Sequence, residues 1–108
     1  MFPIIPAASA ADSGNEEGIF GFGEGSGNVS MTNLVSNAGV VATDTTGVGT
    51  AREGIMACEY GVNQGIFGFG TTGSVTGVTN LVSNAGVVAS DVSAVGTARQ
   101  YGAACSWG

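Results

Sequence analysis

The sequence predicts a mostly β domain that is built from two tandem repeats. Residues 18–61 recur as residues 65–108 at an offset of 47 positions, and 26 of the 44 aligned pairs are identical. Glycine, valine and threonine are abundant in both copies while leucine occurs only at Leu34 and Leu81, which favours strands over helices. A unit of about 45 residues is too small to bury a core alone. We therefore expect the two copies to pack together as one pseudo-two-fold domain.

The residues before the repeats divide into an apolar arm and an acidic linker. The arm covers residues 1–11, where Pro3 and Pro6 favour an extended path. The linker covers residues 12–17 and is rich in turn-forming and acidic residues. An apolar arm outside the repeats needs a surface to pack against, so we expect it to dock on a neighbouring subunit. Its apolar side chains for that contact are Phe2, Ile4 and Ile5.

Each repeat opens with alternating glycine and apolar residues, a pattern that indicates a strand lying close to another backbone. In the second copy, residues 74–83 then read as a strand, residues 84–86 as a turn and residues 87–98 as a second strand. The first copy reads the same way, and the short joint at residues 62–64 places the copies side by side. The expected core or interface anchors are Phe20, Phe22, Phe67 and Phe69.

A second interpretation is an α+β fold with one small-residue helix in each repeat. Residues 33–52 and 80–99 are the two candidate helices. Leu81, Ala85 and Val88 fall at helical spacing. The sequence alone leaves both interpretations open for these segments.

The charge of the chain excludes several classes of partner. There is no histidine or lysine, the two basic residues are Arg52 and Arg99, and the formal net charge is −6. Binding to a phosphate backbone requires a basic surface, so nucleic acid is excluded as a partner. No stretch approaches the roughly 18 apolar residues of a membrane span. The chain is therefore expected to bind neither nucleic acid nor a bilayer core.

Each arginine follows an aspartate by eight positions, which predicts Asp–Arg contacts within or between copies. The four residues of these predicted ion pairs are Asp44, Arg52, Asp91 and Arg99. The two cysteines, Cys58 and Cys105, are repeat equivalents. They form a candidate disulfide if their Cα atoms lie within about 7 Å, and otherwise pair with neighbouring chains or stay reduced.

No motif in the chain predicts catalysis. Residues 68–73 match the spacing G-x-G-x-x-G, but the following residues are a poor helix start and the first copy breaks the pattern at Ser26. A cysteine nucleophile would lack an imidazole partner. The acidic residues near the linker do not match the spacing of a calcium loop. We expect no enzyme activity, no cofactor, no metal site and no small-molecule substrate.

The low charge also indicates what the protein does. Only 9% of the residues are charged, which suits a surface that is buried against other copies. The sequence therefore predicts a structural, self-assembling subunit of an extracellular filament, tube or surface layer. The alternative is a small secreted binding module that contacts a glycan or a protein. Its binding surfaces would be residues 24–31 and 71–78, where the two repeats differ most.

Overall fold

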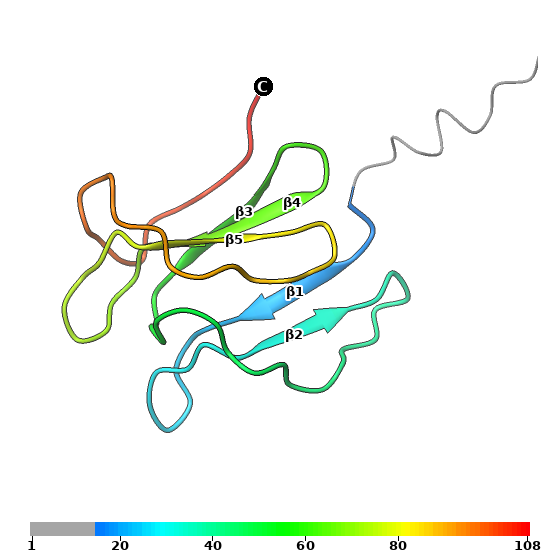
Figure 1. Ribbon diagram of the computed structural model, residues 1–108, viewed down its shortest axis with the longest axis horizontal. Helices are drawn as coiled ribbons and strands as arrows, with labels where there is room; N and C mark the ends of the chain where they lie inside the picture. Colours follow the sequence, from blue (N-terminus) through cyan, green and yellow to red (C-terminus); the bar gives the residue numbers. More distant parts are fainter. Residues whose placement is uncertain (1–14) are drawn as a thin grey trace, which may run out of the picture.

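The computed structural model describes residues 15–108, and this part of the chain is all-β with no helix. Two antiparallel sheets contain five strands (Figure 1). The first sheet pairs β1 (Gly18–Gly21) with β2 (Thr32–Val35). The second sheet has the order β3-β4-β5, with bounds Met56–Tyr60, Gln64–Gly68 and Thr79–Val82.

The predicted mostly β class is confirmed, and the α+β alternative is wrong. Residues 33–52 and 80–99 contain strands, turns and isolated bridges instead of helices. Gly39, Gly49 and Gly86 lie in these segments with φ angles of 80°, 88° and 77°. A left-handed residue interrupts a right-handed helix, so glycine at these positions overrides the helical spacing of the apolar residues.

The strands are shorter than the sequence pattern predicted. Of residues 74–83 only Thr79–Val82 joins the sheet. Residues before it turn back on the end of β4, where the amide of Phe69 donates to the Val78 carbonyl and the amide of Thr76 donates to the Gly70 carbonyl. The expected second strand over residues 87–98 is reduced to isolated bridges to β5.

The two repeats have the same local backbone geometry. Phe22 and its equivalent Phe69 have positive φ angles of 62° and 66°, a conformation uncommon for residues other than glycine. The next glycine donates its amide to the Arg52 carbonyl in one repeat and to the Arg99 carbonyl in the other, at 2.9 Å in both. The sequence repeat is therefore also a repeat of hydrogen bonds.

Strand β3 crosses the boundary between the repeats. It lies at the end of the first repeat, but it pairs with β4 of the second through a turn at residues 61–63. Cys58 lies opposite Ile66 in this register. The sequence equivalent of β3 in the second repeat is residues 103–107, which are exposed and belong to no strand of the described structure (Figure 1).

The core lies between the two sheets. Because side chains alternate along a strand, Ile19, Gly21 and Leu34 share one face of the β1–β2 sheet. It packs against the face of the β4–β5 pair that carries Phe67, Asn80 and Val82. The equivalents of these residues, Phe20, Asn33 and Val35, lie on the other face of the β1–β2 sheet. The buried apolar cluster consists of Phe22, Phe67, Val82 and Val88, with Ile19 and Ile55 packed against it. A pseudo-two-fold would bring equivalent faces together, and this part of the fold prediction is not confirmed.

Candidate assembly interface

Arg52 is the centre of the polar contact between the two repeats. Its side chain is 0% exposed. Nε donates to the Phe69 carbonyl at 2.8 Å, and Nη2 donates to Asn80 Oδ1 at 2.6 Å and to the Val78 carbonyl at 3.3 Å. Nη1 donates to the Thr50 carbonyl at 2.8 Å. The planar guanidinium thus joins the end of the first repeat to the loop and strand of the second.

Asp91 lies at the same contact without a direct hydrogen bond to the arginine. The Thr50 hydroxyl and amide donate to its carboxylate at 2.6 and 3.1 Å, and Asn80 Nδ2 donates at 2.9 Å. These donors lower the pKa of Asp91, with the Thr50 hydroxyl as the largest cause. Burial lowers the pKa of Arg52, and the charge of Asp91 opposes that change. Arg52 from one repeat and Asp91 from the other are therefore joined through Asn80.

Aromatic packing continues the contact on its apolar side. The ring centroids of Phe22 and Phe67 lie 5.1 Å apart at an interplanar angle of 55°. The Arg52 guanidinium carbon lies 4.7 Å from the Phe22 centroid, which is a cation–π distance. A Cβ on Gly21 would lie 2.9 Å from Phe67 Cζ, so the close approach of the sheets requires glycine there.

The predicted aromatic anchors fall into two groups. Phe22 and Phe67 are buried, and Phe69 is half-buried beneath Arg99, whose guanidinium carbon lies 4.2 Å from the ring centroid. Phe20 is different, because it is 63% exposed although its repeat equivalent Phe67 is only 5% exposed. The same side chain in the same strand is thus an interior residue in one repeat and a surface residue in the other.

The remaining polar contacts show the same asymmetry. Asn33 Nδ2 donates to Asp44 Oδ1 at 2.8 Å, as Asn80 donates to Asp91. Arg99 Nη1 donates to the Thr97 carbonyl at 3.0 Å, as Arg52 donates to Thr50, but Arg99 is exposed. These two bonds lie within a single repeat, and each has an equivalent in the other repeat. At the Arg52 contact, the bonds that join the two repeats are made by Arg52 to Phe69, Val78 and Asn80, and by Thr50 to Asp91.

Two outer surfaces follow from this asymmetry, and each is defined by its residues. The Phe20 face is the side of the β1–β2 sheet that points away from the second repeat. It carries Gly18, Phe20, Asn33 and Val35. The Arg99 face is the side of the β3–β4–β5 sheet that points away from the first repeat. It carries Ile66 and Leu81, together with the adjoining Phe69 and Arg99.

The two cysteines are free thiols in the structure. Cys58 is half-buried in β3, whereas Cys105 is exposed in the C-terminal segment. No bond joins them to each other. The arm residues Phe2, Ile4 and Ile5 lie outside the described residues.

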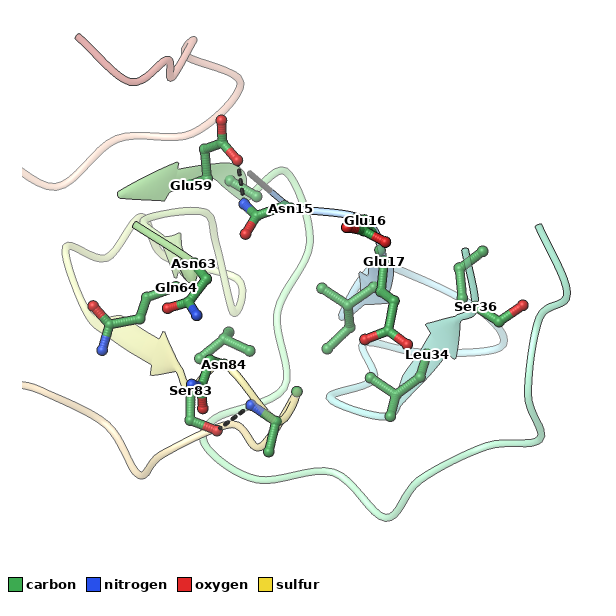
Figure 2. Close-up of a pocket in the computed structure, with 18 of the residues that line it drawn as sticks. Asn15, Glu16, Glu17, Leu34, Ser36, Glu59, Asn63, Gln64, Ser83 and Asn84 are labelled. Carbon is green, nitrogen blue, oxygen red and sulfur yellow. Dashed lines mark hydrogen bonds between the residues drawn. The ribbon is translucent and has the colours of Figure 1, made fainter. Parts of the chain in front are cut away.

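A groove of about 1080 Å³ separates the ends of the two sheets. Figure 2 shows Glu17 and Ser36 on the side of the first repeat, with Gln64 and Asn84 across the groove. Asn15 Nδ2 donates to a carboxylate oxygen of Glu59 at its edge. Apolar residues Ile19, Leu34, Phe67 and Val82 also line it. Within residues 15–108 no cluster of three or more metal-ligating side chains occurs.

The variable segments lie away from this groove. Residues 24–31 and 71–78 form neighbouring loops at the opposite end of the molecule (Figure 1). Asn28 Nδ2 donates to the Thr71 carbonyl at 3.3 Å, which joins the two loops. Residues 68–73, which match the dinucleotide spacing, lead from β4 into the second of these loops and not into a helix.

Sequence reasoning missed the role of the asparagines and threonines at the contact. Asn80 is 0% exposed, and Thr50 supplies two of the hydrogen bonds to Asp91. A signal was present for Asn80, because Thr-Asn-Leu-Val recurs unchanged in both repeats with an amide inside a strand segment, and for Thr50, because Val-Gly-Thr-Ala-Arg recurs as well. An amide in the middle of a strand points to a specific hydrogen-bond partner.

In the described part of the chain, no helix has the length and apolar character needed to cross a membrane. Comparison of the sequence with protein-family models and with curated proteins gave no match.

Proposed function

We propose that the protein is a structural subunit that assembles with copies of itself into an extracellular filament, tube or surface layer. The observation that carries this proposal is the pair Phe20 and Phe67. Both occupy the same position in the same strand sequence, with exposures of 63% and 5%. The second repeat hides this face against the first, while the first repeat leaves the identical face open.

Burial of the Phe20 face would stabilise an assembly appreciably. A phenylalanine side chain that moves from water to a packed site contributes roughly 1.5–3 kcal/mol. Val95 and Trp107 are 96% and 94% exposed, so further apolar surface is available. Exposed apolar surface rimmed by polar groups is typical of protein interaction sites.

Charge and geometry both permit many copies to associate. With 9% charged residues, few charged side chains have to lose water in a contact between subunits, and salt screens the repulsion that the net charge of −6 causes between copies. A contact between two different faces of the same molecule propagates from copy to copy, and produces open helical assemblies when the rotation does not close. The placement outside the cell is part of the proposal, and the low charged fraction supports it. The apolar arm with Phe2, Ile4 and Ile5 is proposed as a second connector.

The test is electron microscopy of the purified chain combined with sedimentation over a range of concentrations. We expect regular fibres or sheets from the unaltered protein. The Phe20→Ser variant should need about 10- to 100-fold more protein to assemble, which is the burial energy expressed as an equilibrium factor.

The matched control is Val62→Ser, because Val62 is 77% exposed but lies on the hairpin turn away from both faces. It should assemble like the unaltered protein. Separate monomers at the highest soluble concentration would contradict the proposal, and so would equal assembly of the Phe20→Ser variant.

A further inference from the structure

We propose that the Arg99 face of one copy binds the Phe20 face of the next copy. In the same contact, residues 103–107 of the first copy pair with the open edge of β1 of the next copy and form a third strand of that sheet. This inference rests on the self-assembly proposed above and names its partner, a second copy of this chain. Each contact in it has an equivalent inside the molecule. It is the interface between the two repeats, moved along the chain by 47 residues.

The strand contact follows from the pairing of β3 with β4. Strand β4 has β3 on one edge and β5 on the other, whereas its equivalent β1 pairs only with β2 among the described strands. Residues 103–107 are the equivalent of β3 and lack a strand partner in residues 15–108. An edge strand with unpaired backbone groups is a template for another chain.

The register of the added strand can be stated residue by residue. Met56 lies opposite Gly68, Cys58 opposite Ile66 and Tyr60 opposite Gln64. A shift of 47 residues places Ala103 opposite Gly21 of the next copy, Cys105 opposite Ile19 and Trp107 opposite Glu17. Trp107 is almost fully exposed in the single chain, whereas its equivalent Tyr60 is half-buried in the paired strand.

The polar contact centres on Arg99. Arg52 uses Nε for the Phe69 carbonyl and Nη2 for Asn80. Arg99 would use the same atoms for the Phe22 carbonyl and for Asn33 Oδ1 of the next copy. Each arginine donates to the carbonyl two residues earlier in the chain. Each guanidinium also lies over an equivalent aromatic ring, Phe22 for Arg52 and Phe69 for Arg99. Arg99 therefore already makes two of the contacts that Arg52 makes.

Two further pairs complete the interface. Thr50 donates from its hydroxyl and amide to Asp91, so Thr97 would donate to Asp44 of the next copy. Phe67 packs on Phe22, so Phe20 of the next copy would pack on Phe69. All residues at these positions are identical in the two repeats, so no side chain has to be replaced for the contact to form.

The experiment uses disulfide cross-linking to read the register. One full-length variant carries Ile19→Cys, Cys58→Ala and Cys105→Ala, and the second carries only Cys58→Ala and so keeps Cys105. Residues opposite each other in antiparallel strands have Cα atoms about 4.5–5.5 Å apart, which a disulfide can span. After mixing under mild oxidation, we expect a covalent dimer that contains one chain of each kind and is lost on reduction.

The chain provides its own calibration. A variant with Ile66→Cys and Cys105→Ala places the introduced cysteine opposite Cys58 in the internal pairing. It should form the same bond within one chain. A Gly18→Cys variant, with both native cysteines replaced by alanine, tests the register. Residue 18 comes one position before residue 19 in β1, and its side chain points to the other face of the sheet. Its cross-link to Cys105 should be at least about tenfold weaker, since side chains on opposite faces point apart.

The outcomes separate this inference from the proposed function. Fibres without the mixed dimer, while the Ile66→Cys bond forms, would overturn the inference and leave self-assembly intact. Dimers from either variant alone would indicate symmetric pairing and also overturn it. The mixed dimer within closed rings of fixed size would support the inference and contradict the filament. Monomers under all conditions would contradict both.

Discussion

Arg52 is buried with neutral acceptors around it, and its geometry explains why arginine occupies the site. A guanidinium presents five N–H donors in a rigid plane, and here they reach carbonyl oxygens and an amide in both repeats. A lysine would offer a single nitrogen and could not reach acceptors on two sides. The contact therefore depends on the shape of the side chain as much as on its charge.

Replacing Arg52 should destabilise the fold much more than replacing its equivalent. We expect Arg52→Ala to lower the free energy of unfolding by about 3–5 kcal/mol, because it leaves buried acceptors without donors and opens a cavity. Arg99→Ala should cost less than about 1 kcal/mol, since the side chain is exposed. The measurement is urea unfolding followed by circular dichroism at concentrations where the chain is monomeric. Equal losses in the two variants would contradict this account of the interface.

At the level of residues, the sequence predicted Asp–Arg contacts, whereas the hydrogen bonds of Asp44 and Arg99 go to Asn33 and to the Thr97 carbonyl. Asp91 and Arg52 lie at one contact because Asn80 stands between them and bonds to both. An eight-residue spacing carries no information on such a three-part arrangement. The sequence also could not predict that Phe67 is buried and Phe20 exposed, because the two repeats have the same residues around these positions.

At the level of elements, Gly21 determines how closely the two sheets approach. A Cβ there would lie 2.9 Å from both Phe67 Cζ and Thr32 Cγ2. We expect Gly21→Val to cost about 1–3 kcal/mol, because it must force the sheets apart or push Phe67 from its rotamer. For a domain of this size, each kcal/mol lowers Tm by about 4–8 °C. Differential scanning calorimetry measures the change directly.

The control for this prediction is Gly25→Val. Nothing lies within 4 Å of a Cβ at Gly25, and its φ angle is not in the left-handed region. Its Tm should stay within about 2–4 °C of the unaltered protein, the range expected for an exposed site. A comparable fall in both variants would mean that valine weakens these glycine-rich segments in general, and that close sheet packing is not the cause.

Four of the five strands were predicted from the sequence, but β3 and the strand partners were not. Alternating glycine and apolar residues indicated β1 and β4, and the strand predicted over residues 74–83, with its counterpart in the first copy, contains β5 and β2. The residues of β3 belong to the first repeat by sequence offset, and no strand was predicted there, whereas the backbone of β3 pairs with the second repeat. Hydrogen-bond pairing depends on the turn at residues 61–63, and a repeat alignment does not encode it.

At the level of the whole molecule, the two repeats meet through different faces. Gly21 and Leu34 of the first repeat contact Phe67 and Gly86 of the second. The same contacts for Gly68 and Leu81 would require the equivalents of Phe67 and Gly86 from a further repeat or from another copy of the chain. An interface of this kind leaves one unsatisfied face at each end, in contrast to a two-fold contact, which satisfies both.

Deletion of residues 1–11 separates the contribution of the arm from that of the sheet faces. The truncated chain should keep its fold, because the strand pairing of both sheets and the apolar core are formed by residues 15–108. If the arm is a connector between subunits, sedimentation should show a shift toward monomers while the circular dichroism spectrum stays unchanged. Fibres with an unchanged subunit spacing would mean that the arm is not a connector, and that the Phe20 and Arg99 faces are sufficient to hold the copies together.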